Sequence, residues 1–287
     1  MTEILNDRAL VLIKGSDSKK FLQGLITKNI EQGTSNLTYC LMLNAQGKYL
    51  YELFLYPRED GFIAEIYKAH KDSFIGKLKI YKLRSQVEFY DVSEEYAVLW
   101  SKHPLSDACI SAPDPRMQDL GYRSIIAKKT LLNYATEMGS GTYLKLKYQL
   151  AIPEYSELVQ EKSFPLEYGL EQLSAIDFDK GCYIGQEPIS RTKYRGVVRK
   201  NIYKVIAEKN FKEFLELGAS TDTGEEDESS NIAIMAGDTK IGKLLSYLGQ
   251  LAIALVREEE LAKAEEQNLS ITIAGEKVSV CKPSWRE

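Results

Sequence analysis

The most informative segment of this 287-residue chain is Lys180-Gly181-Cys182-Tyr183-Ile184-Gly185-Gln186-Glu187. Two glycines bracket a cysteine and a tyrosine, which lets the backbone turn sharply and approach a ligand or another segment closely. Cys182 also lies close in sequence to several basic side chains. Nearby positive charge stabilises a thiolate, so the pattern indicates a reactive thiol, while a small buried residue beneath the loop is an equally good interpretation.

Basic side chains follow this segment at positions 191, 193, 195, 199 and 200. In an extended strand Arg191, Lys193 and Arg195 would share one face, because strand side chains alternate. Three cations on one face predict an anion-binding site. The competing interpretation is a solvated strand edge that Lys and Arg protect against aggregation, and the pattern alone favours it.

The composition is that of an ordinary globular protein with roughly two domains. Apolar residues make up 44% of the chain, and 37 basic against 41 acidic side chains give a net charge of -4. This balance provides no global positive field for nucleic acid or anionic lipid, so any anion site must be local. No run of about 18 apolar residues exists, and the first eight residues lack an apolar core, so we expect no membrane insertion, no leader and a cytoplasmic location.

Cysteine and histidine usage restricts metal chemistry. The four cysteines, Cys40, Cys109, Cys182 and Cys281, form no C-x-x-C pair. This spacing predicts free thiols and neither a zinc site nor a self-contained iron–sulfur ligand set. His70 and His103 are the only histidines, and we expect both at the surface.

Hydrophobic periodicity and turn signals predict interleaved strands and helices, hence an α+β fold. The expected strands of the first part are Arg8–Ile13, Leu37–Leu43, Tyr49–Tyr56, Phe62–Ile66, Val87–Val92 and Tyr96–Trp100, with helices after Ser16 or Asp17 and over Ala69–Arg84. Gly47 can supply the positive φ of a hairpin turn over Asn44–Lys48. We expect a loop over His103–Gln118, while Glu137–Ile152 fits either a strand or a helix.

The pattern changes near residue 200, where we place the boundary between domains 1–200 and 201–287. A polar segment over Gly218–Asn231 is expected to form a solvated loop. Short strands at 232–235, 240–247, 251–256, 271–274 and 278–281, with a charged helix over Glu258–Gln267, indicate a small barrel or sandwich.

The octapeptide at 180–187 and its basic tail to Gly196 resemble the signature of the YgfZ-type folate-binding family. That family is related to the glycine-cleavage aminomethyltransferase and includes a mitochondrial iron–sulfur assembly factor. Further matches lie in order at Gly15–Thr27, Asn44–Lys48, Tyr81–Ser85, Asp114–Arg123, Ile152–Glu154, Phe164–Glu167, Gly242–Tyr247 and Pro283–Trp285. The resemblance implies ferredoxin-like units around a central folate channel, two of them within residues 1–200, plus a small C-terminal β-barrel.

The resemblance also implies a site for tetrahydrofolate or its one-carbon or polyglutamylated derivatives. Tyr143 would stack on a ring, and Glu154 or Glu167 would accept the N–H donors of the pterin. Arg8 replaces an aromatic residue of the family's pocket and would contact the ligand through its guanidinium group. Glu52 is the candidate for the acidic group that serves catalysis in the aminomethyltransferases. The remaining candidates come from the octapeptide and its tail: Lys180, Tyr183, Gln186 and Glu187 near the ligand, and Arg191, Lys193 and Arg195 for the glutamate tail.

We therefore predict a tetrahydrofolate-binding accessory protein for iron–sulfur cluster assembly or repair, with iron–sulfur enzymes or cluster-assembly proteins as partners. Cys182 would act as a transient ligand, a redox thiol or a nucleophile, and the sequence leaves these roles open. The alternative is a folate-dependent aminomethyl or methyl transferase, for example in tRNA modification, with Glu52 as general acid or base. A nucleic-acid-binding module using Arg191–Lys200 is a third class, which the net charge and the lack of an evident aromatic RNA-binding motif disfavour for both RNA and DNA.

Overall fold

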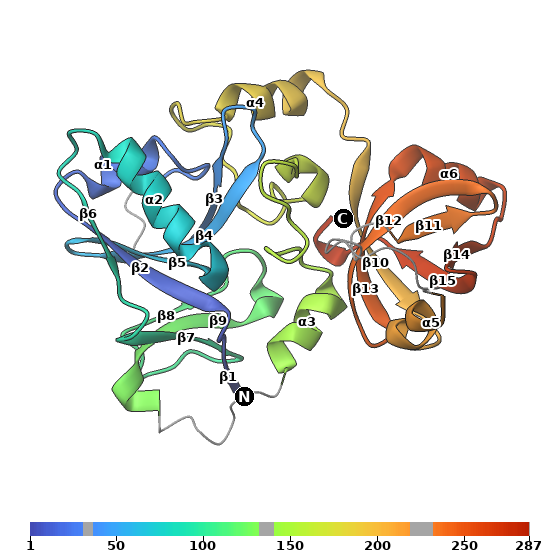
Figure 1. Cartoon of the computed structure of the whole chain (residues 1–287), viewed down its shortest axis with the longest axis horizontal. Coiled ribbons are helices and arrows are strands. Elements are labelled where there is room, and N and C mark those ends of the chain that lie inside the picture. Colours follow the sequence, from blue (N-terminus) through green and yellow to red (C-terminus); the bar gives the residue numbers. More distant parts are fainter. Residues whose placement is uncertain (31–36, 132–140, 219–231, 287) are drawn as a thin grey trace. The chain divides into compact units, whose positions relative to one another are not determined.

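The computed structural model describes residues 1–30, 37–131, 141–218 and 232–286 (Figure 1). They divide into two compact units. Unit 1 comprises Met1–Tyr143, Val159–Lys162 and Leu170–Arg191, and unit 2 comprises Leu144–Leu158, Ser163–Gly169 and Thr192–Glu287. Each unit consists of three separate segments of the chain, so the units do not test a single boundary at residue 200. That boundary stays a prediction.

Unit 1 contains a five-stranded antiparallel sheet with the strand order β3-β4-β5-β2-β6. The strands are β2 (Arg8–Lys14), β3 (Thr38–Leu43), β4 (Tyr49–Arg58), β5 (Gly61–Tyr67) and β6 (Glu88–Asp91). Helices α1 (Ser18–Gln23) and α2 (Lys71–Lys82) contribute Phe21, Leu22, Phe74 and Leu78 to the core on one face. Gly47 has a φ of 74° in the turn between β3 and β4, so the predicted hairpin is confirmed.

Strand β4 is buried on both faces over its first eight residues. Because strand side chains alternate, Tyr51, Leu53 and Leu55 join the core beneath the helices, whereas Glu52 and Phe54 point to the opposite face. That opposite face therefore carries a buried carboxylate.

A second sheet of unit 1 has the strand order β1-β7-β9-β8. Its strands are β1 (Thr2–Ile4), β7 (Tyr96–Ser101), β8 (Ile110–Pro113) and β9 (Tyr122–Ala127). The expectation of a loop throughout His103–Gln118 is wrong in part, because Ile110–Pro113 pairs with β9. Pro113 is tolerated there because β8 is an edge strand.

Two helices occupy segments for which the sequence had suggested a strand or had left strand and helix open. Residues Thr142–Leu150 form helix α3. Of the two structures that the sequence allowed for Glu137–Ile152, the described part is therefore a helix. Residues Gln186–Arg195 form α4, so the expectation of an extended segment with three cations on one face is wrong. Pro188 is compatible with this helix because it lies in the first turn. At helical spacing Arg191 and Arg195 share a face, and Lys193 points elsewhere.

Unit 2 contains a closed barrel with the strand order β10-β13-β12-β11-β14-β15 (Figure 1). Its elements are β10 (Lys200–Ala207), α5 (Phe211–Gly218), β11 (Ala233–Ala236), β12 (Thr239–Leu248), β13 (Leu251–Arg257), α6 (Glu258–Glu266), β14 (Ile271–Ile273) and β15 (Glu276–Cys281). Val205, Ala254 and Val256 belong to its core. The α+β class and the C-terminal barrel are thus confirmed, while most of the expected polar loop, residues 219–231, lies outside the described residues.

Candidate functional site

Cys182 lies in the loop that precedes α4, and its side chain is exposed. The interpretation of Cys182 as a small buried residue beneath the loop is therefore wrong. Cys109 is the other exposed cysteine of the described ranges, whereas Cys40 is buried and Cys281 is intermediate. Burial raises the pKa of the Cys40 thiol far above its ordinary value, so Cys40 stays protonated and inert.

The Cys182 loop packs closely against the turn of the β3–β4 hairpin. Gly185 has a φ of 84°, and a Cβ atom there would lie 2.5 Å from the carbonyl oxygen of Asn44. Across the contact, a Cβ atom at Gly47 would lie 3.1 Å from the Cβ of Pro188. Glycine at 47 and 185 thus permits the approach that holds the loop in place. No local pattern in either glycine segment predicts this contact, because the two segments lie far apart in the sequence.

The side chain of Lys180 ties the same loop to the segment that follows α1. Its Nζ donates hydrogen bonds to the carbonyl oxygens of Gln23, Ile26 and Lys28 at 2.7, 2.6 and 3.2 Å. An ammonium group has three donors, so Lys180 uses its full donor capacity within the protein. Gln186 donates in turn to the carbonyl oxygen of Lys180 at 3.2 Å. Both predicted ligand residues therefore stabilise the loop.

Tyr183 of the octapeptide has a buried polar atom, its hydroxyl oxygen, that forms no hydrogen bond within the described residues. Its side chain is only 7% exposed, and the Lys180 ammonium lies 4.8 Å from the centroid of its ring. Burial raises the pKa of Tyr183 to about 12, so the hydroxyl remains protonated.

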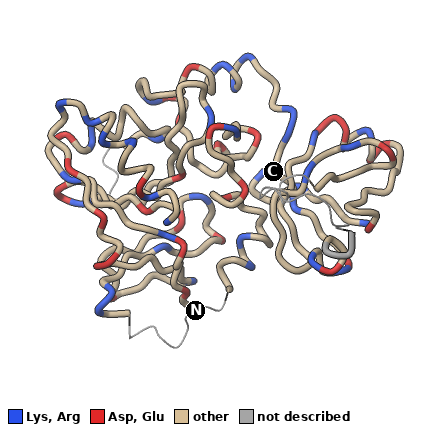
Figure 2. The backbone as a smooth tube through the Cα atoms, viewed as in Figure 1, with Lys and Arg blue, Asp and Glu red and all other residues tan. Residues whose placement is uncertain are grey.

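The predicted charged residues of α4 are all exposed: Glu187, Arg191, Lys193 and Arg195. Figure 2 shows these charges along the helix and basic residues again after it. Arg191 and Arg195, one turn apart, form the pair that can act together on one anionic group.

Glu52, the candidate catalytic carboxylate, is buried in an ion pair. Arg8 Nη1 donates to Glu52 Oε1 at 2.8 Å, and both side chains are 1% exposed. The hydroxyl of Tyr39 donates to Glu52 Oε2 at 3.2 Å. Arg8, which was expected to contact the ligand, thus binds the very carboxylate that was expected to perform catalysis.

Tyr143 belongs to an adjoining buried network. Its hydroxyl accepts hydrogen bonds from Arg116 Nη2 at 2.8 Å and from Arg123 Nη1 at 3.1 Å. Arg116 forms a bidentate pair with Asp114 at 2.9 and 2.7 Å, and Arg123 pairs with Glu65. Burial alone would raise the pKa of Asp114, yet the two guanidinium groups hold this pKa below its ordinary value. The Asp-Pro-Arg segment therefore supplies a buried ionic network, and Tyr143 is part of it.

The remaining predicted carboxylates, Glu154 and Glu167, belong to unit 2. Glu154 is 3% exposed, and its backbone N–H donates to Glu157, which pairs with Lys147 at 2.8 Å. Glu167 lies 3.8 Å from Lys200, and partial burial raises its pKa. Tyr143 and Glu167 thus have partners within the protein, whereas tetrahydrofolate binding stays a prediction.

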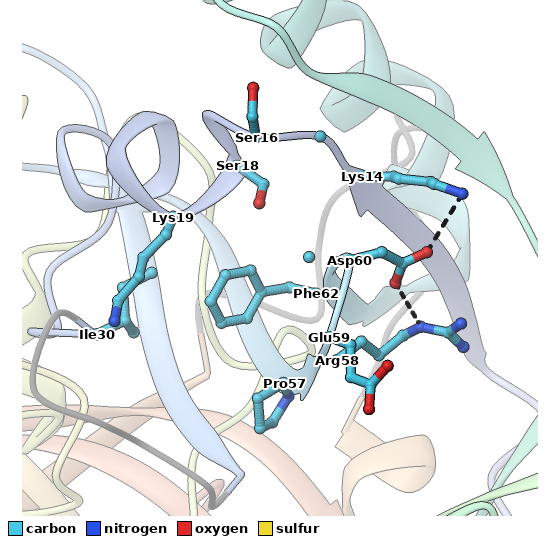
Figure 3. Close-up of a pocket in the computed structure, with 12 residues that line it drawn as sticks. Lys14, Ser16, Ser18, Lys19, Ile30, Pro57, Arg58, Glu59, Asp60 and Phe62 are labelled. Carbon is cyan, nitrogen blue, oxygen red and sulfur yellow. Dashed lines mark hydrogen bonds and ion pairs between the residues drawn. The ribbon is translucent and has the colours of Figure 1, made fainter.

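A cleft of about 530 Å³ lies elsewhere in unit 1, beside the start of α1 (Figure 3). Asp60 pairs there with Lys14 at 3.3 Å and with Arg58 at 3.1 Å. The cleft is lined by Lys14, Gly15, Ser16, Ser18, Lys19, Ile30, Pro57, Arg58, Glu59, Asp60, Gly61 and Phe62. None of the predicted site residues lines it.

The described ranges contain no group of three His, Cys, Asp or Glu side chains that could hold a metal ion. Among their helices, none is long and apolar enough to cross a membrane.

Comparison with solved structures defines the class of fold. The crystal structure of glycine cleavage system aminomethyltransferase T from Bartonella henselae matches with a TM-score of 0.71 and 10% identity, over 99% of this chain and 84% of that chain. At this identity the likeness shows the fold alone. A family model described as the CAF17 C-terminal beta-barrel domain matches residues 199–287, the range of the closed barrel. The protein thus has an aminomethyltransferase-like fold with a CAF17-type barrel.

Comparison of sequences gives the family. The mitochondrial iron-sulfur cluster assembly factor IBA57 homolog of Pyricularia oryzae is 31% identical over 276 residues, covering 89% of this chain and 71% of the relative. The protein of the same name from Coccidioides immitis is 29% identical and covers 90% and 71%. The chain belongs to the IBA57 family of iron–sulfur cluster assembly factors. The YgfZ-type proteins that its octapeptide resembles are a related family, and these relatives carry the IBA57 name instead.

The expectation of a cytoplasmic protein is wrong. The matched relatives are named as mitochondrial, which points to the mitochondrion. The composition of the first eight residues, on which the expectation rested, is weaker evidence of location than the names of these relatives.

Proposed function

We propose that this chain supports the assembly or repair of iron–sulfur clusters in other proteins through the thiol of Cys182. Membership of the IBA57 family supports the role, since its members are named as cluster assembly factors. The observation that carries the assignment to Cys182 is its exposure on a loop that the protein holds rigidly.

The geometry suits a thiol that meets another molecule. Lys180 fixes the loop two residues before Cys182, and Gly185 docks it on the hairpin three residues after. A thiolate is a soft ligand for iron, and clusters are commonly held by four thiolates. In this proposal Cys182 supplies one ligand, and the partner that carries or receives the cluster supplies the others.

The test compares two exposed cysteines. In cells that lack the chain, Cys182→Ala should fail to restore the activity of iron–sulfur enzymes, whereas Cys109→Ala should restore it. Both variants should melt within about 2 °C of the wild type, because neither side chain is buried. Full restoration by Cys182→Ala would contradict the proposal.

Tetrahydrofolate, in a one-carbon or polyglutamylated form, is the second part of the proposal. The observation that favours it is the unused hydroxyl of Tyr183 in a segment that continues into the exposed Arg191 and Arg195. The hydroxyl can pair with a polar ring atom, and the guanidinium groups can receive carboxylates of the glutamate tail. No chemical step is assigned to the folate.

Calorimetry with the full chain tests this part. Tetrahydrofolate should bind saturably, and Arg191→Ala with Arg195→Ala should weaken the longest polyglutamate tails most. Lys193→Ala is the matched control, since Lys193 lies on the same helix but points elsewhere. Absence of binding, or an equal loss for every tail length, would remove folate from the proposal without affecting the role of Cys182.

A transferase is not proposed. Glu52 would have to exchange protons with a substrate, yet it is buried and bound to Arg8 and Tyr39. The geometry instead gives Glu52 a structural role.

A further inference from the structure

The chain segment at the end of α1 binds the Cys182 loop on both sides of the thiol. This segment, Gln23–Asn29, supplies the three carbonyl oxygens that Lys180 binds before Cys182. After Cys182, the backbone N–H of Ile184 donates to the carbonyl oxygen of Gly24 at 3.3 Å. The segment and the loop both belong to unit 1. Gln23–Asn29 is therefore a platform that holds both arms of the loop.

Thr27 fixes the platform to the first sheet and to the chain that leads into the loop. Its side chain is fully buried, and its hydroxyl donates to the carbonyl oxygen of Ala175 at 2.6 Å. The same hydroxyl accepts from the backbone N–H of Leu41 on β3 at 2.8 Å. The backbone N–H of Thr27 donates to the Leu41 carbonyl oxygen at 3.0 Å. The platform thus links the chain before Cys182 to a buried strand.

Asp177 binds the platform at the start of the loop. Its Oδ1 lies 2.5 Å from Lys28 Nζ, and its Oδ2 accepts from the backbone N–H of Asn29 at 2.9 Å. Its own backbone N–H donates to the carbonyl oxygen of Thr27 at 2.9 Å. The side chains of Lys28 and Asp177 are 25% and 30% exposed. A partly exposed ion pair contributes little to global stability, so this contact is expected to matter for the loop and not for folding.

A thiol that serves as a ligand to a cluster has to be placed accurately. Metal–ligand distances keep to within about 0.2 Å of their ordinary values, and a ligand that is already ordered saves the entropy of ordering on binding. A loop opens locally at a lower free energy than the whole protein unfolds. A contact that adds little to global stability therefore still determines how often the loop opens.

We propose that Asp177 is a positioning residue for the Cys182 thiol. It acts through Lys28 and Asn29 of the platform, and it keeps the loop in the conformation in which the thiol meets the cluster of a partner. This proposal rests on the proposed function, because it requires Cys182 to be the ligand. Asp179 offers a comparison in the same stretch of chain, since its side chain is exposed and has no polar partner in the described ranges.

Hydrogen exchange on the full chain tests the positioning role. In Asp177→Ala the Ile184 amide should exchange about tenfold faster than in the wild type, although Ile184 follows Cys182 and Asp177 precedes it. Asp179→Ala is the matched control and should exchange like the wild type. The amides of β2 should keep their wild-type rates in both variants, which separates opening of the loop from a loss of global stability.

The activity of iron–sulfur enzymes in cells that lack the chain tests the consequence. Asp177→Ala should restore about threefold less activity than the wild type, since residues that orient a ligand residue support activity without touching the metal. Asp179→Ala should restore the activity fully. Asp177→Asn should lie between Asp177→Ala and the wild type, because its amide oxygen can still accept from the Asn29 N–H but cannot form an ion pair with Lys28.

The outcomes separate this proposal from the proposed function. Full restoration by Asp177→Ala, together with failure of Cys182→Ala, would overturn the positioning role alone, whereas full restoration by Cys182→Ala would overturn both. Unchanged exchange at Ile184 would show that Asp177 acts only locally, and faster exchange in β2 as well would show a purely structural contact; either result contradicts the proposal. If Asp177→Ala does not fold, Asp177→Asn decides, and wild-type exchange at Ile184 with wild-type activity would then overturn the positioning role.

Discussion

Lys180 and Cys182 lie two residues apart and have opposite environments. The thiol of Cys182 is exposed, whereas the Lys180 ammonium is buried against three carbonyl oxygens. In the proposed function Cys182 acts on another molecule, and Lys180 holds the loop that presents it. The family resemblance placed Lys180 near the ligand, and the carbonyl oxygens that Lys180 binds come from a distant segment that the motif does not contain.

We expect Lys180→Met to destabilise the chain by about 3 kcal/mol, because three carbonyl oxygens lose a charged donor. Urea unfolding measures this loss. Lys193→Met on the exposed side of α4 is the control and should change the free energy of unfolding by less than about 0.5 kcal/mol. Similar values for the two variants would contradict the anchoring role of Lys180.

His70 gives the stability a dependence on pH. Its ring lies between those of Tyr51 and Tyr67, with centroids 6.0 and 5.0 Å away, and its Nδ1 is buried without a hydrogen bond in the described ranges. Burial lowers the pKa of His70 from its ordinary 6.5, so the unfolded chain binds the proton more readily than the folded one. Stability from His70 is therefore complete above pH 6.5 and is lost as the pH falls through the lowered pKa.

Melting temperatures between pH 7.5 and 5 test this sign. The change should correspond to less than about 1 kcal/mol, because the ring is only half-buried. His70→Gln should flatten the profile, whereas His103→Gln, at an exposed position, should leave it unchanged. A profile that stays steep in His70→Gln would assign the effect to other groups.

At the scale of elements, the contact between the Cys182 loop and the β3–β4 turn explains why both segments contain glycine. Gly185→Ala should destabilise the chain by at least about 2 kcal/mol, since the new Cβ meets the Asn44 carbonyl oxygen at 2.5 Å and φ is 84°. Gly181→Ala is the matched control in the same loop, because nothing lies within 4 Å of its Cβ position. Denaturant unfolding of both variants measures the difference, and a tolerated Gly185→Ala would show that the loop does not depend on this contact.

Local sequence patterns predicted some elements and failed for others, for physical reasons. The β3–β4 hairpin was predictable because alternation and Gly47 both report on local geometry. The α4 helix was missed because alternating cations suggested a strand, while the helix depends on Gln186 to Pro188 forming its first turn. Strand β8 was missed because its edge pairing with β9 is a long-range contact that tolerates Pro113.

At the scale of the whole molecule, the interleaved strands and helices predicted the α+β class. The short strands after residue 200 indicated a barrel or a sandwich, and the family resemblance implied the barrel that the structure contains. The buried ionic network did not follow, since no local pattern pairs Arg8 with Glu52 or Arg123 with Glu65. Two charged side chains on different strands look like surface residues until the sheets are assembled. The side chains of Arg8 and Tyr143 are hydrogen-bonded to Glu52 and to Arg123, and their roles toward a ligand stay predictions.

Arg123 lies at the centre of contacts between the two sheets of unit 1. Arg123 is fully buried on β9, pairs with Glu65 of β5, and places its guanidinium carbon 3.9 Å from the Phe54 ring centroid of β4. It therefore joins the two sheets of the unit. Arg123→Met should cost about 3–5 kcal/mol in urea unfolding, because Glu65 loses its guanidinium partner inside the core.

Two further variants distinguish loss of the ion pair from loss of packing. Lys14→Met removes the exposed pair with Asp60 and should cost less than about 1 kcal/mol. Adding Glu65→Gln to Arg123→Met should recover part of the stability, because the buried Glu65 carboxylate would otherwise keep only the Arg8 guanidinium at 3.7 Å and the Tyr56 hydroxyl at 2.8 Å among its described polar contacts. If the two substitutions instead add their separate losses, Arg123 joins the sheets through the volume of its side chain and its contact with Phe54, and the charge of Glu65 has no part in it.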